Sequence, residues 1–273
     1  MIRPGWLVAR VLAGWLLLVA AAPPALADEL KIGGTGGALG AMRLIGDAFT
    51  ALNPDIRVTV LPSLGSGGGI KAAIRGAVDV AVASRPLTDA ERKAGASSTE
   101  YARTPFVFAV AEKSPVGALT LDQLADIYAG RVAKWADGME IRLVLRPIGD
   151  ADSLQVKAMS AKLNEAKTMA EKRPGMAFAI TDQDAADDIA RIPGALGPTT
   201  LALIVSEKRP LRPLKLDGVE PSLKNLAAGL YRHSRTMTIV TGSKSSPAAQ
   251  KFVAFVRSPA GRDILVRAGN LPL

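Results

Sequence analysis

The sequence predicts an α/β protein built on a parallel sheet, and three features lead to this fold class. Segments with strand-like alternation are followed by segments with helical periodicity, and this order implies a parallel sheet with right-handed crossovers. The turns between them are rich in glycine early in the chain. The length also fits one large domain or two lobes of ordinary size.

The first 27 residues are expected to be a secretory signal peptide. Two arginines precede an apolar run over residues 11–22, and Ala25-Leu26-Ala27 supplies a small-x-small cleavage site. The run is too short to cross the roughly 30 Å of a bilayer core. Cleavage before Asp28 predicts a periplasmic protein, and an uncleaved N-terminal anchor is the alternative. The chain has no cysteine, which excludes disulfides, thiol chemistry and a lipid anchor at the cut.

The first third of the chain has a β-α-β-α-β pattern followed by a third helix. Apolar residues from Leu39 to Leu52 recur at three- and four-residue spacing, so this segment is a helix that Asn53-Pro54 ends. Thr88 and Glu91 have the spacing of a capping box. The expected elements are a strand at 30–32, a helix from 38 to 52, a strand at 56–63, a helix at 70–75, a strand at 78–84 and a helix from 88.

The rest of the chain continues the alternation. A helix over 119–130 ends at Gly130, and Ser246-Pro247 begins two paired C-terminal helices. The proline-rich segment 209–216 is expected to be extended and to cross between lobes. The other expected elements are a strand at 104–115, a strand, turn and helix over 141–163 with the turn at 150–153, a second strand-helix segment at 177–197, an apolar strand at 200–206 and a strand at 236–243.

The polar turns at the strand ends are expected to form an anion site. In parallel sheets, ligands bind outside the carboxyl ends of the strands, where helix N-termini converge. Glycine lets the free N–H groups of a helix start approach an anion, and arginine makes forked contacts to oxyanions. The expected donors are Thr35, Gly36 and Gly37 at the first helix, Ser66, Gly67 and Gly68 at the second, Ser84 and Arg85 after the third strand, and Arg146 at a later strand end.

Each of these groups also has a purely structural explanation. Glycine turns before helices are common in α/β proteins that bind no ligand there. Arg85 could pair with Asp79 or Glu91, and Arg146 could belong to a structural salt bridge. A ligand is favoured only because two glycine turns and Ser84-Arg85 occur in one β-α-β-α-β run.

Charge and composition argue against several other classes of function. The net charge is +9, or +7 once Arg3 and Arg10 leave with the leader, so lipid, polysaccharide or a small anion could be partners. The charges are scattered and few aromatic residues could stack on bases, which disfavours nucleic acid. The single histidine, His233, excludes a histidine-rich metal site and leaves acyl transfer without its usual base, although a serine–lysine pair stays open.

These motifs resemble the periplasmic phosphate-binding proteins of ABC transporters. The matching segments are "GGTGGALG", "GSGGGIKAAIRGAVDVAVASRPLTDAE", "LTLDQLADIYAGRVAKWADG", "IPGALG", "LDGVEPSLKNLAAGLY" and "SPAGRDILVRAG". The resemblance implies the type II periplasmic-binding fold, in which two α/β lobes are joined by crossover strands that form a hinge. Lobe I would contain residues 28–108 and 209–273, and lobe II residues 109–208.

The resemblance also implies a function. It implies a monomeric binding protein, not an enzyme, that captures phosphate or a similar oxyanion without a metal or cofactor and delivers it to an ABC transporter permease in the inner membrane. Ser66 falls on the family's ligand serine, and Arg146 matches its second-lobe arginine. The alternatives are an accessory or sensory protein of the same fold for a non-phosphate ligand, a cell-envelope enzyme and an adhesion protein that binds polyanions.

The chain departs from the family pattern at two places. Ser84 stands at the position of a phosphate-contacting acid that many relatives also lack. Three residues separate Arg146 from Asp150-Ala151-Asp152, where the family usually has Ser-Gly-Thr. A carboxylate about 4 Å from an anion costs roughly 4 kcal/mol at an effective dielectric near 20. The aspartates could cap a helix, accept a proton from the ligand or mark a different ligand. We expect Asp152 to be the cap, leave Asp150 open and expect Ser153 to act as a donor.

Overall fold

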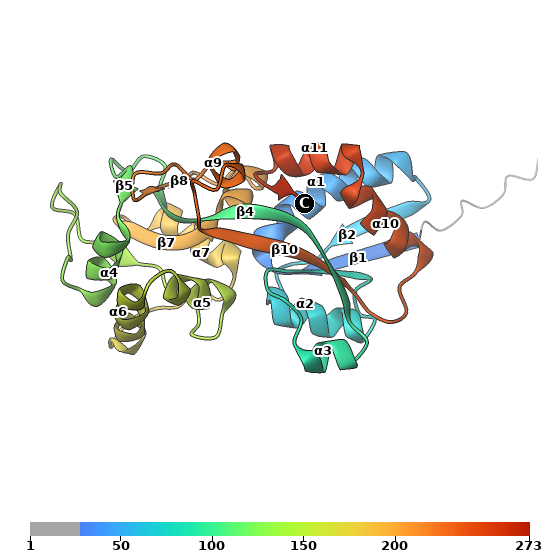
Figure 1. Ribbon diagram of the computed structural model, residues 1–273, viewed down its shortest axis with the longest axis horizontal. Helices are drawn as coiled ribbons and strands as arrows, with labels where there is room; N and C mark the ends of the chain where they lie inside the picture. Colours follow the sequence, from blue (N-terminus) through green and yellow to red (C-terminus); the bar gives the residue numbers. More distant parts are fainter. Residues whose placement is uncertain (1–27) are drawn as a thin grey trace, which may run out of the picture.

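The computed structural model of the protein describes residues 28–273, so the expected signal peptide lies outside the described part of the chain. Two α/β lobes lie side by side, and the strands β4 (Ser97–Ala111) and β10 (Ser234–Thr241) connect them (Figure 1). The strands follow the order β2-β1-β3-β10-β4-β7-β6. The two-lobe α/β arrangement expected from the sequence is therefore present.

The first lobe is a sheet with helices on both faces. The strands β1, β2 and β3 are parallel, and β10 lies antiparallel between β3 and β4. The elements of this lobe are β1 (Asp28–Gly34), α1 (Gly36–Leu52), β2 (Ile56–Val60), α2 (Gly65–Ile74), β3 (Val80–Ala83), α3 (Asp89–Lys93), α10 (Pro247–Arg257), α11 (Pro259–Arg267) and β11 (Leu271–Pro272).

The second lobe is built around the C-terminal half of β4. That half pairs with β7 and β8, and the short β6 lies parallel to β7 at the outer edge. The elements of this lobe are β5 (Ala118–Leu119), α4 (Leu121–Ala129), β6 (Arg142–Leu143), α5 (Ala151–Ala158), α6 (Ala161–Lys172), α7 (Asp182–Arg191), β7 (Ala195–Thr200), α8 (Leu201–Ser206), β8 (Leu211–Pro213), β9 (Lys215–Leu216) and α9 (Leu223–Ala227).

The alternation of side chains along the strands builds a core on each face of the sheet. In β3, Val80 and Val82 pack with the core under α1 and α10, whereas Ala81 and Ala83 pack with the core under α2. In β4, Phe106 and Phe108 face α4 and α6. Val107 and Ala109 point to the opposite side and face α7 and α8. These hydrophobic clusters fix the strands of both lobes in place. They therefore also fix the strand ends that face the space between the two lobes.

Several signals read from the sequence are confirmed as helix ends. The Thr88–Glu91 capping box is present at α3, and Gly130 ends α4 with a left-handed φ of 79°. Ser246 caps α10, with Pro247 as its first residue. These signals are local, so the surrounding fold has little influence on them.

The apolar segment at 200–206 is a helix, and the expectation of a strand there is wrong. β7 ends at Thr200, whose hydroxyl then accepts the N–H of Leu203 at 3.2 Å and caps α8. Ala202, Leu203 and Ile204 are all buried. A short apolar run has the same composition in a buried helix and a buried strand, so composition alone could not separate the two.

The chain returns to the first lobe later than expected. Segment 209–216 is extended as predicted, but it pairs within the second lobe, where Leu214 and Leu216 join the core around Tyr128. Tyr231 belongs to the same core and donates its hydroxyl to the carbonyl of Phe106 at 2.8 Å. The boundary predicted at residue 209 is therefore too early, because the chain crosses only as β10 begins.

Candidate functional site

A cavity of about 570 Å³ lies between the lobes at the strand ends where the topology predicts a ligand. Its walls come from the starts of α1, α2, α5 and α7, from the turn after β3 and from β10. The main polar residues that line it are Thr35, Ser66, Ser84, Arg85, Asp150, Asp152, Gln155, Asp182 and Arg235. Both lobes therefore contribute polar groups to one site.

Two serines and a threonine form the polar wall of the first lobe. Thr35 lies between β1 and α1, Ser66 lies in the first turn of α2, and Ser84 directly follows β3. The hydroxyl of Ser66 accepts the N–H of Ser84 at 3.0 Å and lies 3.2 Å from the hydroxyl of Ser84. This contact links the start of α2 to the end of β3 and orients both hydroxyls beside the cavity.

The glycine run belongs to α2 and does not precede it. The helix begins at Gly65, which has a φ of +65°, and not near Ile70 as expected. A Cβ at Gly69 would lie 2.5 Å from the Cα of Gly34, so glycine is needed where α2 crosses the end of β1. Gly67 lines the cavity, whereas Gly68 is absent from its lining and faces Leu64.

Arg85 lines the cavity but is already paired. Its guanidinium donates to both carboxylate oxygens of Glu91, at 2.7 and 2.9 Å, and to the carbonyl of Pro86. The hydrogen bonds from Arg85 lower the pKa of Glu91 to about 2. The structural alternative of an Arg85–Glu91 pair is therefore present, and Arg85 brings a largely neutralised charge to the cavity wall.

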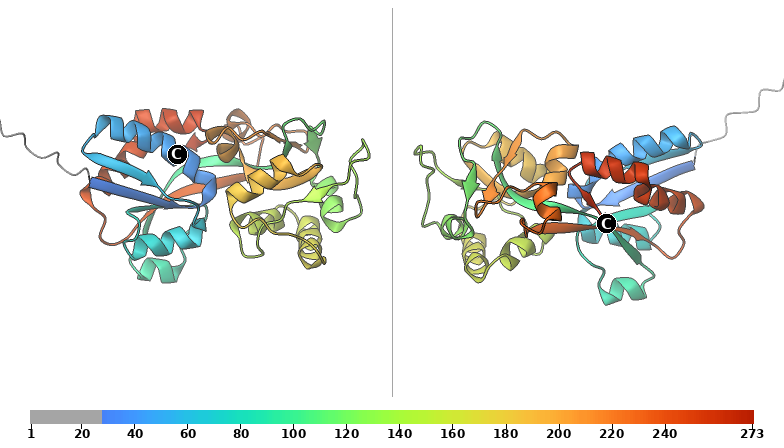
Figure 2. Two further views of the ribbon diagram at one scale, coloured as in Figure 1. Left: turned by 180° about the vertical axis from the view of Figure 1, so that it is seen from behind. Right: turned by 45° about the horizontal axis from the view of Figure 1, so that its top comes forward.

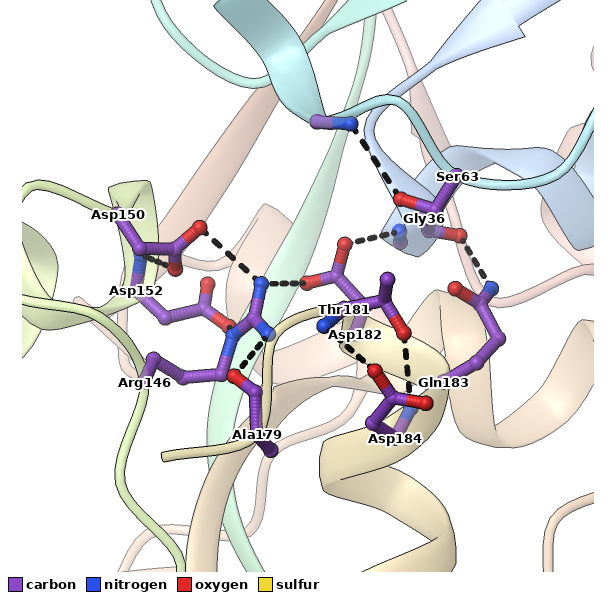
Figure 3. A network of polar contacts seen from close by, with 12 residues as sticks. Gly36, Ser63, Arg146, Asp150, Asp152, Ala179, Thr181, Asp182, Gln183 and Asp184 are labelled. Carbon is purple, nitrogen blue, oxygen red and sulfur yellow. Dashed lines mark hydrogen bonds and ion pairs between the residues drawn. The ribbon is translucent and has the colours of Figure 1, made fainter. Parts of the chain in front are cut away.

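Arg146 is buried behind the cavity and holds three carboxylates (Figure 3). Its Nη2 donates to Asp150 at 3.1 Å and lies 3.8 Å from Asp182, and its Nε lies 3.6 Å from Asp152. Its Nη1 donates to the carbonyl of Ala179 at 2.7 Å. The structural salt bridge weighed for this arginine is present, and its side chain is not in the cavity lining.

The expected helix cap falls on the other of the two unusual aspartates. Asp150 is the cap of α5, since its Oδ1 accepts the N–H of Asp152 at 2.9 Å. Asp152, predicted to be the cap, lies within the first turn of α5, is buried, and pairs with Nη2 of Arg235 at 2.6 Å. Burial raises the pKa of both carboxyl groups. The prediction that Asp152 caps the helix is therefore wrong.

Ser153 does not face the cavity. Its side chain is fully buried, its hydroxyl donates to the carbonyl of Arg146 at 2.8 Å, and the ammonium of Lys167 lies 3.1 Å from the same oxygen. Lys167 in turn pairs with Glu171. In this arrangement Ser153 supports the Arg146 turn from behind and offers no donor to a ligand.

The first turn of α1 is in contact with a carboxylate from the other lobe. Gly37 donates its N–H to Oδ2 of Asp182 at 3.2 Å, and Gln183 donates to the carbonyl of Gly36 at 3.1 Å. The backbone N–H of Thr35 donates to the carbonyl of Val82 at 2.9 Å. Seen from behind, the gold helix α7 meets the blue helix α1 at this point (Figure 2).

Reasoning from the sequence missed Arg235 and Asp182. The position of Arg235 directly before the strand expected at 236–243 was a signal, because a charge buried at a strand end needs a partner. Asp182 carried no such signal, since it reads as an ordinary acid at a helix start. With both included, two guanidinium groups, Arg146 and Arg235, face three carboxyl groups, Asp150, Asp152 and Asp182.

Residues 28–273 were also compared with the requirements of metal sites and membrane-spanning helices. Among them, no group of histidine, aspartate and glutamate side chains is arranged to hold a metal ion. None of the helices in this range combines the length and the apolar character needed to cross a bilayer. His233 lies outside the cavity, with its ring 5.8 Å from that of Tyr231.

Comparison with known families and proteins gives consistent matches. Residues 19–260 match the family described as PBP superfamily domain. The chain is 27% identical over 246 residues to the phosphate-binding protein PstS of Bacillus subtilis, covering 83% of this chain and 75% of that protein. It is 22% identical over 254 residues to the phosphate-binding protein PstS of Borreliella burgdorferi, covering 89% and 91%.

Solved structures with the same fold include two proteins named for phosphate. One is assigned as a phosphate ABC transporter substrate-binding protein from Clostridium perfringens, with bound phosphate; its TM-score is 0.76 at 23% identity, covering 90% of this chain and 100% of that one. The other is an ABC-type phosphate transport receptor from Vibrio cholerae, with a TM-score of 0.59 at 20% identity, covering 89% and 99%. At these identities the likeness establishes the fold.

Proposed function

Because the chain belongs to the PBP superfamily and has the two-lobe fold of type II periplasmic binding proteins, we propose that it captures phosphate or a similar oxyanion for an ABC transporter. The relatives named above support this ligand class by their names and their shared length. The proposal includes a periplasmic location, delivery to a permease in the inner membrane, a monomeric state and no catalysis.

One observation carries the proposal: hydroxyl groups from three strand ends converge on a single cavity between the lobes. Ser66 and Ser84 are already positioned by their mutual contact, and Thr35 lies at the start of α1. We propose that these hydroxyls and the N–H groups of Gly37 and Gly67 contact the oxyanion. Arg85, Arg146, Gly36 and Gly68 would act mainly through charge or packing.

Isothermal titration of ligand-stripped protein with phosphate, sulfate, molybdate and tungstate tests this function. We expect saturable binding of at least one of these anions. A Ser66→Ala variant should bind it about tenfold more weakly, since a hydrogen bond to a charged group is worth about 1.5–3 kcal/mol. No heat from any of the four anions would contradict the proposal.

The aspartates favour a second candidate, a sensory or accessory protein of the same fold for a different ligand. Asp150 and Asp152 stand where the family resemblance implies hydroxyl donors, and they place carboxyl groups on the second-lobe side of the cavity. A ligand with an ammonium or hydroxyl group beside its acid would suit these acceptors. A thermal-shift screen that finds stabilisation by such compounds and none by inorganic phosphate would favour this candidate.

A further inference from the structure

We propose that the Asp182 carboxylate is a resident anion of the cleft, which an incoming oxyanion must displace from the N-terminus of α1. This inference rests on the proposed function, because it describes how the same site is regulated. It starts from the contact between Oδ2 of Asp182 and the N–H of Gly37, two residues that are far apart in the sequence.

The start of α1 lacks the side chains that usually accept hydrogen bonds from the free N–H groups of a helix N-terminus. Thr35 stands at the cap position but makes no capping hydrogen bond with its side chain, and the first turn of the helix contains no acid. A helix of 17 residues has a partial positive charge at this end. Asp182, from the other lobe, therefore provides the negative group that the local sequence omits.

The residues around Asp182 direct its carboxylate toward α1 in the ligand-free protein. A Cβ at Gly36 would lie 2.6 Å from Oδ2 of Asp182, so any side chain there would force this carboxylate to shift. Gln183 anchors the same end of α7 by donating to the carbonyl of Gly36 at 3.1 Å and to Glu207 at 2.9 Å. The capping box of Thr181 and Asp184 sets the direction in which α7 begins.

The position of Asp182 is the one that an oxyanion would take. Its Oδ2 meets the α1 N–H group, its Oδ1 lies 3.8 Å from Nη2 of Arg146, and it lines the same cavity as Ser66 and Ser84. Helix N–H groups and a guanidinium are the donors that oxyanion sites combine. Two anions cannot share the Gly37 N–H, so binding requires the carboxylate to move away.

The test compares Asp182→Asn with the matched control Asp188→Asn, which removes a carboxylate that pairs with Arg191 on the same helix. Each protein is titrated with phosphate and with sulfate at pH 7. We expect Asp182→Asn to bind both anions at least about tenfold more tightly than wild type, because a like charge at contact distance is removed. The control should stay within about twofold, since its charge is distant and screened.

The two anions separate displacement from direct recognition. If Asp182 instead accepts a proton from the bound ligand, Asp182→Asn will weaken phosphate binding and leave sulfate unchanged or stronger. That result, or an unchanged affinity for both anions, would overturn the inference. Circular dichroism melting of each variant shows whether the isosteric changes preserve the fold.

A second measurement keeps this inference distinct from the proposed function. The amide signal of Gly37 in a ¹⁵N–¹H spectrum should shift in Asp182→Asn but not in Asp188→Asn, and this difference reports the contact without any ligand. In the wild-type protein, the Gly37 amide signal should also shift when phosphate saturates the site. Saturation by calorimetry with an unmoved Gly37 signal would overturn the displacement, whereas the absence of any oxyanion binding would contradict the proposed function itself.

Discussion

Acidic residues distinguish this site at the level of single residues. Arg146 and Arg235 are both buried, and together they face Asp150, Asp152 and Asp182. Removing one partner from a buried ion pair is costly, because the other charge is then left without compensation in a medium that solvates it poorly. The five side chains therefore act as one unit, and a change in one alters the charge balance of all.

The stability of this cluster should depend on pH. Burial raises the pKa of Asp152. At pH values just above the ordinary aspartate pKa, the folded protein therefore keeps a proton on Asp152 that the unfolded chain has already released. The contribution of this group to folding is therefore greatest below about pH 4 and is lost as the pH rises. The unfolding free energy of Asp152→Asn minus that of wild type should therefore increase as the pH rises above about 4, as measured by urea unfolding.

The exposed Asp47 on α1 offers the control for this measurement. The difference in unfolding free energy between Asp47→Asn and wild type should change less with pH than the difference for Asp152→Asn. If the Asp152→Asn difference is flat, or moves in favour of wild type as the pH rises, the raised pKa is not the cause of the pH dependence.

The role of a residue could be predicted from the sequence when its partners lie close to it in the chain, and not when they come from distant elements. The pairing of Arg85 with Glu91 was one of two partners weighed, and both residues lie within one short segment. The contacts of Asp182 and Arg235 depend on where separate elements meet, which no local pattern encodes. The capping role of Asp150 was misassigned because two aspartates two residues apart fit a helix start equally well.

At the level of elements, α2 shows why several glycines occur in one helix. Gly65 needs a left-handed φ, and Gly69 needs close contact with β1, but Gly67 has neither requirement. Glycine inside a helix costs roughly 1 kcal/mol relative to alanine. The fold itself therefore requires glycine at two of these positions. At Gly67 the neighbouring cavity explains why a side chain is absent.

Alanine substitutions should separate these roles. Gly69→Ala should destabilise the protein by about 1–3 kcal/mol, because its Cβ would overlap the backbone of Gly34. Gly67→Ala meets only Nη2 of Arg85, at 3.6 Å, and should raise the unfolding free energy by up to about 1 kcal/mol. Urea unfolding of both variants measures this contrast, and equal losses for the two would refute the assignment.

The elements that the sequence predicted well are those with end signals of their own. The capping box of α3, the glycine end of α4 and the serine-proline start of α10 are local, and each is present in the structure. α8 was mistaken for a strand because its few apolar residues are buried, and tertiary packing decides their conformation. The start of α2 was placed late because glycine lowers helix propensity, although packing holds the first turn in place.

At the level of the whole molecule, the lobes are connected by β4 and by the entry into β10. Along β4, pairing changes from β10 to β7 between Pro105 and Phe106, so one continuous strand serves two sheets. A hinge of this kind lets the lobes rotate by small backbone changes while each core stays packed. The cavity lies between these lobes, so its size depends on their angle.

Ligand binding should therefore close the lobes, and the chain is well suited to a direct measurement because it contains no cysteine. Leu64 and Leu154 are exposed on opposite sides of the cleft, so cysteines at both positions can carry spin labels without competing thiols. We expect saturating phosphate to shorten and narrow the distribution of distances between the labels, because bonds from both lobes to one anion favour the closed arrangement. A control pair at Leu44 and Leu52, both exposed on α1, should not change. An unchanged distance between Leu64 and Leu154, with binding demonstrated by calorimetry in the same sample, would show that the lobes do not close around the ligand.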